Sequence, residues 1–332
     1  MSFQLADAYP GTMPADFDAF CTLSAKLGQD PMRVQGPGGN TSIKDGNTLW
    51  IKASGTELAD AERKPIFLAV NREAARAEAL GAGDGTCQST VLDTAAGLRP
   101  SIETTFHALI DWPVVAHTHS VATIVHAISD DGLAVARGKL AGLPIATVPY
   151  RKPGRPLTQA IADAIFSNTQ VVLLGNHGLI IAGPSVADVA ELTEEVERRL
   201  HMPVLHDLSP TAPPPDGWAY LSNAALAIDA RLSSLAAPGS YYPDHVVFLG
   251  PGLPTKPADT SQAFLDVGKG LAVREGATPA QRAMANCVSD VLIRLPEDWT
   301  PNPIGSHAEA ELLNWDAEKY RQALAAREAG SA

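Results

Sequence analysis

Two apolar runs joined by a short glycine-flanked turn constrain this chain most strongly. Residues 170–183 read QVVLLGNHGLIIAG, and the turn falls at Gly175–Gly178. Short apolar runs bounded by glycine are typical of β-strands. Another such run, VVAHTH at 114–119, predicts a further strand. Helical and strand patterns mix along the chain without regular alternation, which favours an α/β or α+β layered domain.

The N-terminal part adds a helix and a hairpin. Apolar residues at helical spacing followed by a glycine predict a helix over 14–28. Two alternating runs flank Asp45-Gly46-Asn47, which is typical of a β-hairpin turn. The run IFLAV predicts a strand over 66–70.

A proline-rich stretch, SPTAPPPDG at 209–217, marks the largest break in composition. We therefore expect a domain over residues 1–208 and a mixed α/β C-terminal extension over residues 209–332. The elements predicted in the extension are a helix near 219–235, a strand over 245–249, a helix opened by Thr278-Pro279 with a capping box completed by Gln281, and a last helix from about 307 to 327.

Charge and cysteine content exclude several classes of function. The chain has 25 basic and 37 acidic residues, which argues against nucleic acid or an anionic membrane as the main partner. Its three cysteines include no CxxC pair, so neither a disulfide framework nor a thiolate zinc site is expected. The N-terminal stretch shows no signal peptide, and no apolar stretch approaches the roughly 20 residues that span a bilayer. We expect a cytoplasmic protein with a small-molecule partner.

Three histidines form the first candidate site. His117 and His119 stand two apart on a predicted strand, so both imidazoles face the same side. An HxH pair alone is more often two ordinary strand histidines. His177, however, lies in the turn between the two apolar strands. Three imidazoles with an open fourth position are typical of a catalytic zinc site, and Mn²⁺ or Co²⁺ would also suit such ligands.

A carboxylate and several turns complete the candidate residues. Ser101 can cap a helix that extends to about Ile110, which places Glu103 in its first turn. Glu103 is then either a partner of the helix dipole or, beside a metal, a group that shuttles a proton. Backbone N–H groups that could converge on an anion belong to Gly38-Gly39-Asn40-Thr41, Ser54-Gly55 and Ser101, although each alone is an ordinary turn. Neither a Walker A loop nor a dinucleotide-binding fingerprint occurs in the sequence.

Five short motifs in this order resemble the class II aldolase/adducin family, which includes L-fuculose- and L-rhamnulose-1-phosphate aldolases, L-ribulose-5-phosphate 4-epimerases and related decarboxylases. The motifs are GGNTS at 38–42, ASGTEL at 53–58, RPSIE at 99–103, HTHS at 117–120 and NHGL at 176–179.

The resemblance implies a three-layer αβα sandwich with a largely antiparallel central sheet. It also implies a homotetramer with sites at subunit interfaces. Zinc ligands would fall on His117, His119 and His177, and the acid/base carboxylate on Glu103. Phosphate contacts would fall on Asn40, Thr41, Ser54, Gly55 and Ser101.

One position departs from the family pattern. The fuculose-phosphate enzymes carry two adjacent serines before the glutamate, whereas this chain has Ser101-Ile102. One phosphate hydrogen bond is therefore missing, and whether the substrate is phosphorylated stays open. Lys52 and the basic loop RKPGR at 151–155 could compensate or grip a carboxylate, or they could be solvated loop charges, which is the commoner case. Residues 218–332 resemble the stretch that follows the aldolase part in bifunctional rhamnulose-phosphate aldolase/alcohol dehydrogenase proteins.

The function that these residues and the resemblance imply is that of a zinc-dependent lyase of carbohydrate metabolism. It would cleave a ketose, expected to be a ketose 1-phosphate, to dihydroxyacetone phosphate or its analogue and an aldehyde through a metal-stabilised enediolate. The alternatives are a metal-dependent decarboxylase of a 3-oxo sugar acid, a 4-epimerase and a non-catalytic adducin-like scaffold.

Overall fold

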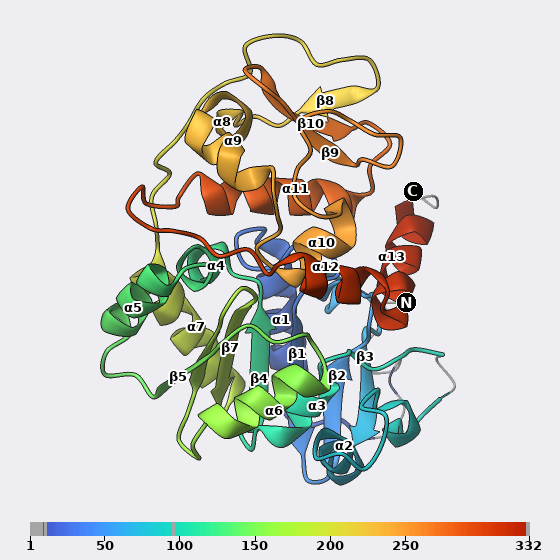
Figure 1. The fold of residues 1–332 in the computed structure, drawn as a ribbon. Coiled ribbons are helices and arrows are strands. Elements are labelled where there is room, and N and C mark those ends of the chain that lie inside the picture. Colours follow the sequence, from blue (N-terminus) through green and yellow to red (C-terminus); the bar gives the residue numbers. More distant parts are fainter. Residues whose placement is uncertain (1–8, 10–11, 95–96, 330–332) are drawn as a thin grey trace. The chain divides into compact units, whose positions relative to one another are not determined.

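A computed structural model of the protein describes residue 9, residues 12–94 and residues 97–329 (Figure 1). We expected no signal peptide in the N-terminal stretch, and most of that stretch lies outside the described residues. Among the helices that the structure describes, none has the length and apolar character needed to cross a membrane.

The chain folds into two compact units, and each unit is built from segments that are separated in the sequence. The first comprises Met1–Ser120, Leu140–Leu174 and Gly178–Arg199, and the second Val121–Lys139, Gly175–His177 and Leu200–Ala332. The expected boundary between residues 208 and 209 stays a prediction.

A seven-stranded sheet forms the centre of the first unit, in the order β3-β2-β1-β4-β7-β6-β5. Every neighbouring pair is antiparallel except β5 and β6. The strands are β1 (Asn40–Asp45), β2 (Thr48–Lys52), β3 (Phe67–Asn71), β4 (Val114–Thr118), β5 (Ile145–Val148), β6 (Val171–Leu174) and β7 (Gly178–Gly183).

Helices cover both faces of this sheet (Figure 1). On one face, Phe17 and Phe20 pack against the rings of Trp50 and Phe67. On the other, Phe106 belongs to a buried apolar cluster with side chains of β4, β6 and β7. The helices are α1 (Phe17–Gln29) and α7 (Val186–Leu200) on the first face, and α2 (Arg72–Ala79), α3 (Thr104–Leu109) and α6 (Arg155–Ala164) on the second. The predicted three-layer αβα architecture with a largely antiparallel sheet is confirmed.

Two turns of the sheet follow the sequence prediction. Asp45 pairs with Thr48, so Gly46-Asn47 forms a two-residue hairpin loop, with Gly46 at a φ of 54°. Leu174 pairs with Gly178, so the Gly-Asn-His segment between them makes the second turn. The runs beside the second turn are apolar and fully buried, because helices cover both faces of the sheet.

The second unit combines a small sheet with short helices, as expected for a mixed α/β extension. The sheet has the order β8-β10-β9. Its strands are β8 (Trp218–Tyr220), β9 (Ala263–Asp266) and β10 (Gly270–Arg274), and its helices are α4 (Val121–Ala127), α5 (Asp130–Lys139), α8 (Ala225–Ile228), α9 (Ala230–Ala236), α10 (Pro243–Leu249), α11 (Pro279–Leu292), α12 (Ser306–Leu313) and α13 (Asp316–Ala329). The capping box predicted at the start of α11 is present between Thr278 and Gln281.

Three predictions for this unit were wrong. The apolar run over 245–249 is helical, because it lies inside α10, which starts at Pro243 and is followed by Gly250. All its residues are buried, so apolar periodicity could not separate strand from helix. The helix expected over 219–235 is a strand followed by two short helices, and the helix expected over 307–327 is interrupted at Asn314 and Trp315.

Candidate metal and active site

His117 and His119 meet at the end of the central strand. His117 lies on β4 and is fully buried, and His119 follows directly after that strand. The Nδ1 atom of His117 lies 3.0 Å from the carbonyl oxygen of Leu179. Because a carbonyl oxygen only accepts, Nδ1 carries a proton, and in the neutral ring Nε2 then keeps its lone pair. That Nε2 atom lies 3.2 Å from Nε2 of His119.

His177 reaches the same place from the turn between β6 and β7. Thr118 pairs with Leu179 across the sheet, so this turn lies at the same edge as the end of β4. Asn176 holds the turn with a φ of 53°, a conformation that asparagine tolerates better than most residues. The three histidines are buried, and one ligand atom of each lies within 4.8 Å of the others.

Gly178 leaves no space for a side chain beside this turn. A Cβ atom there would lie 2.3 Å from the carbonyl oxygen of Thr118. We expect Gly178→Ala to lower the free energy of unfolding by about 1–3 kcal/mol, because β7 must move away from β4. Urea denaturation measures the change.

Gly138→Ala is the matched control for that substitution. Gly138 is exposed in α5, and a Cβ there would meet nothing within 4 Å. Its variant should be as stable as the wild type or more stable by about 0.4–1 kcal/mol. Equal stability of the two alanine variants would show that the close approach of β7 to β4 is not a constraint.

Glu103 lies beside the histidines, at the N-cap position of α3, and the prediction that it stands in the first turn of a helix capped by Ser101 was wrong. It is the residue before α3, it is buried, and its side chain makes no capping hydrogen bond. Its Oε2 atom lies 3.4 Å from Nε2 of His117 and accepts a hydrogen bond of 2.8 Å from Nδ2 of Asn40. A carboxylate oxygen and imidazole nitrogens therefore converge in one buried place.

The strand register explains why Asn40 is part of this group. Asn40 pairs with His117 across β1 and β4, so the two side chains share a face of the sheet. The same amide donates a hydrogen bond of 3.1 Å to Oγ of Ser101. Thr41 points to the opposite face, where its hydroxyl lies 2.7 Å from Oγ of Ser24 on α1. The structure thus brings Asn40 and Ser101 to Glu103, but not the hydroxyl of Thr41.

The Ser54-Gly55 turn lies next to Ser101. Ala53 and Pro100 form a β-bridge, and the backbone N–H of Ser54 donates to the carbonyl of Arg99. Lys52 is buried behind this turn, and its ammonium donates to the carbonyl oxygens of Pro37 and Thr56. Lys52 therefore braces two of the loops in which the sequence predicted anion contacts.

His107 was not singled out in the sequence, yet it contacts this group directly. Its Nε2 atom lies 2.5 Å from Oδ1 of Asn40, and its Nδ1 atom lies 2.7 Å from Oγ of Ser42. Burial, the positive charge of Lys44 and the neighbouring His117 hold the pKa of His107 well below its ordinary value. The one feature of the sequence that could have indicated His107 is its position four residues after Glu103, one helical turn along α3.

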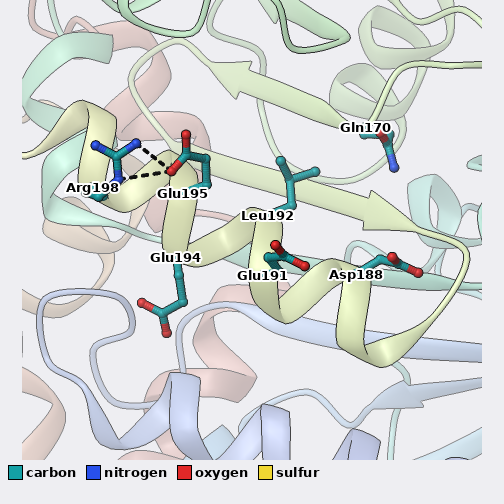
Figure 2. Close-up of a pocket in the computed structure, with 7 residues that line it drawn as sticks. All are labelled: Gln170, Asp188, Glu191, Leu192, Glu194, Glu195 and Arg198. Carbon is teal, nitrogen blue, oxygen red and sulfur yellow. Dashed lines mark hydrogen bonds and ion pairs between the residues drawn. The ribbon is translucent and has the colours of Figure 1, made fainter.

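The hollow along α7 is a separate feature (Figure 2). Its walls are formed largely by acidic side chains of that helix, and Glu195 is paired there with Arg198. None of the residues that line it belongs to the group around His117. It is a solvated acidic helix face rather than part of the candidate site.

Fold and site together define a layered α/β protein whose central strand ends in a centre of three histidines. Residues 19–204 match the family model described as the class II aldolase and adducin N-terminal domain. The chain therefore belongs to the class II aldolase and adducin family, and this membership supports an enzyme.

Two curated relatives and one solved structure illustrate the similarity. The L-fuculose phosphate aldolase of Methanocaldococcus jannaschii is 23% identical over 198 residues, which cover 58% of this chain and 97% of that protein. The uncharacterized oxidoreductase YuxG of Bacillus subtilis is 28% identical over 190 residues, which cover 52% of this chain but only 27% of that protein. The N-terminal class II aldolase domain of a Thermoplasma acidophilum protein superposes with a TM-score of 0.50 at 23% identity, over 60% of this chain and 98% of that domain.

Proposed function

We propose that the protein is a metal-dependent carbon–carbon lyase that cleaves a ketose to dihydroxyacetone phosphate, or its unphosphorylated analogue, and an aldehyde. The observation that carries this proposal is the convergence of buried imidazoles and one buried carboxylate at the end of β4. Nε2 of His117 lies 3.2 Å from His119 and 3.4 Å from the carboxylate of Glu103. The family match and the similarity to an L-fuculose phosphate aldolase support it.

The chemistry of the donor atoms fits a divalent metal ion. His117, His119 and His177 would hold the ion, which we propose to be Zn²⁺, although Mn²⁺ or Co²⁺ would suit the same donors. The hydrogen bond from Nδ1 of His117 to a backbone carbonyl is the usual arrangement that orients a metal-binding imidazole. When bound, such an ion supplies a Lewis acid for the negative charge that develops on the substrate oxygens.

The remaining residues would orient the substrate and move a proton. Glu103 would take or give the proton at the carbon next to the ketone. The hydrogen bond from Asn40 holds its carboxylate toward the histidines. Asn40, Ser101 and the Ser54-Gly55 turn would contact the far end of the substrate. From Thr41, only backbone groups remain for this role, because its hydroxyl faces α1.

Two further parts of the proposal concern the protein's setting. We propose a homotetramer with sites at subunit interfaces, as the family resemblance implies, and a cytoplasmic location. Sedimentation of the metal-loaded protein tests the first, and localisation of the tagged chain in cells tests the second.

A product screen tests the reaction itself. Metal-loaded protein is incubated with ketoses, ketose phosphates and 3-oxo sugar acids, and the release of aldehyde and of carbon dioxide is followed. Aldehyde release is the expected result. Carbon dioxide would indicate a decarboxylase, interconversion of epimers would indicate a 4-epimerase, and the absence of turnover would indicate a scaffold.

Ile102 gives a prediction about phosphate recognition. It is half-buried between Ser101 and Glu103, and it offers no hydroxyl to a phosphate. A charge-assisted hydrogen bond contributes about 1.5–3 kcal/mol, or roughly 10- to 100-fold in affinity. We therefore expect Ile102→Ser to raise the ratio of kcat/KM for phosphorylated over free ketose by that factor. Ile102→Val is the control that keeps the ratio, and a wild type strictly dependent on phosphate would contradict this prediction.

A further inference from the structure

His107 makes two short contacts that are explained neither by metal binding nor by proton transfer at Glu103. It is fully buried on α3, and its two ring nitrogens each face one polar side chain of β1. Nε2 lies 2.5 Å from Oδ1 of Asn40, and Nδ1 lies 2.7 Å from Oγ of Ser42. Both nitrogens are therefore engaged away from the three histidines of the candidate metal site.

The charge state of His107 fixes the number of its ring protons. The ring of Phe106 stacks on that of His107 with the centroids 4.5 Å apart, so an apolar side chain covers one face of the imidazole. Burial first, and then the charge of Lys44, hold the pKa of His107 well below its ordinary value, which favours the neutral ring with one proton. The position of this proton decides which nitrogen donates and which accepts.

The amide of Asn40 resolves that choice. Its nitrogen faces Oε2 of Glu103 at 2.8 Å and Oγ of Ser101 at 3.1 Å, and its oxygen faces His107. An amide oxygen cannot donate, so the His107 proton lies on Nε2. Nδ1 then accepts from the hydroxyl of Ser42.

The reversed arrangement carries a clear penalty. If the proton lay on Nδ1, the amide nitrogen of Asn40 would have to face Nε2 of His107. Its oxygen would then face the carboxylate of Glu103, and two acceptors would meet without a proton between them. The tautomer of His107 thus determines which end of the amide faces Glu103.

We infer that His107 is a positioning residue of the active centre, which acts through Asn40. Its Nε2–H locks the amide so that Nδ2 donates to Glu103 and to Ser101, and the hydroxyl of Ser42 donates to the remaining ring nitrogen, Nδ1. These hydrogen bonds follow from the distances around Asn40 and from the neutral state of His107. Their consequence for turnover rests on the proposed function.

Neutron diffraction of deuterium-exchanged crystals of the metal-loaded protein tests the hydrogen bonding without any assay of activity. We expect a deuteron on Nε2 of His107 directed at Asn40, one on Oγ of Ser42 directed at Nδ1, and the amide deuterons of Asn40 directed at Glu103 and Ser101. A deuteron on Nδ1, or a reversed amide, would overturn the inference even if the protein is an active aldolase.

Two variants test the consequence for turnover. His107→Gln can place an amide N–H where Nε2 stood, whereas His107→Leu has a similar volume and no donor. We expect the leucine variant to lose about 10- to 100-fold in kcat/KM, because misplaced groups at an active centre cost on that order, while glutamine restores most of it. Metal content should stay unchanged in both.

A double variant separates positioning from general damage. In the Glu103→Gln background, His107→Leu should cause little further loss, because the residue it positions is already disabled. Equal losses in the leucine and glutamine variants, or fully additive losses in the double variant, would overturn the inference. If the wild type shows no lyase activity, the proposed function fails, and the neutron result still decides the positioning role.

Discussion

Replacing Glu103 by glutamine is expected to leave metal and fold in place while kcat falls by about 10²- to 10⁴-fold, the usual contribution of general acid–base catalysis. A glutamine keeps the shape and one oxygen that can accept the hydrogen bond from Asn40, but it cannot take the proton. Metal content, melting temperature and kcat of the one variant measure the three quantities separately.

The competing interpretation of Glu103 predicts a different result. A glutamate that only stabilises a helix dipole contributes about 0.3–1 kcal/mol to stability and nothing to the rate. The structure already weakens this interpretation, because the side chain makes no cap hydrogen bond and instead faces Asn40 and His117. Near-normal turnover of Glu103→Gln would remove this residue from the mechanism.

Glu78 provides a matched control for this substitution. It is also buried, and its carboxylate accepts hydrogen bonds from the backbone N–H groups of Gly85 and Cys87 and from the hydroxyl of Ser89. These are contacts that organise a loop. Glu78→Gln should therefore lower the melting temperature and leave kcat nearly unchanged, the opposite of the pattern expected for Glu103.

The parts of the fold that could be predicted from the sequence are those set by local chemistry. Gly46-Asn47 predicts a hairpin loop because few residues adopt its backbone angles, and Thr278 with Gln281 predicts a helix start through reciprocal hydrogen bonds. The run over 245–249 carries no such information, since a fully buried segment shows no periodicity. Pro243 and Gly250 were the better indicators of a helix there.

The candidate site likewise has one part that could be predicted from the sequence and one part that could not. The three histidines could be brought together from the sequence because two share a strand face and the third stands in a turn between neighbouring strands. His107 could not, because its partners come from β1, more than sixty positions earlier in the chain. The opposite directions of the Asn40 and Thr41 side chains follow from strand alternation, which places only Asn40 on the face of His117.

The loss of metal from His117→Ala is the most decisive expectation for this protein. Wild-type protein should carry one divalent ion per subunit, and the variant should carry close to none and show no turnover. The imidazole removed is fully buried, and its Nε2 atom lies 3.2 Å from Nε2 of His119 and 3.4 Å from Oε2 of Glu103. Two remaining histidines leave a divalent ion short of the three protein ligands usual for a catalytic zinc site.

Thermal unfolding with and without added Zn²⁺ separates this expectation from a folding defect. A ligand that binds only the folded state stabilises it by about 2.7 kcal/mol at a concentration one hundred times its Kd. The melting temperature of the wild type should therefore rise with Zn²⁺, and that of His117→Ala should not respond. His126→Gln is the control: His126 is buried on α4 and burial lowers its pKa to about 4, but it lies outside the histidine group. It should keep its metal, whereas a His117→Ala protein that retains both full metal content and activity would show that these histidines are ordinary residues of the protein interior.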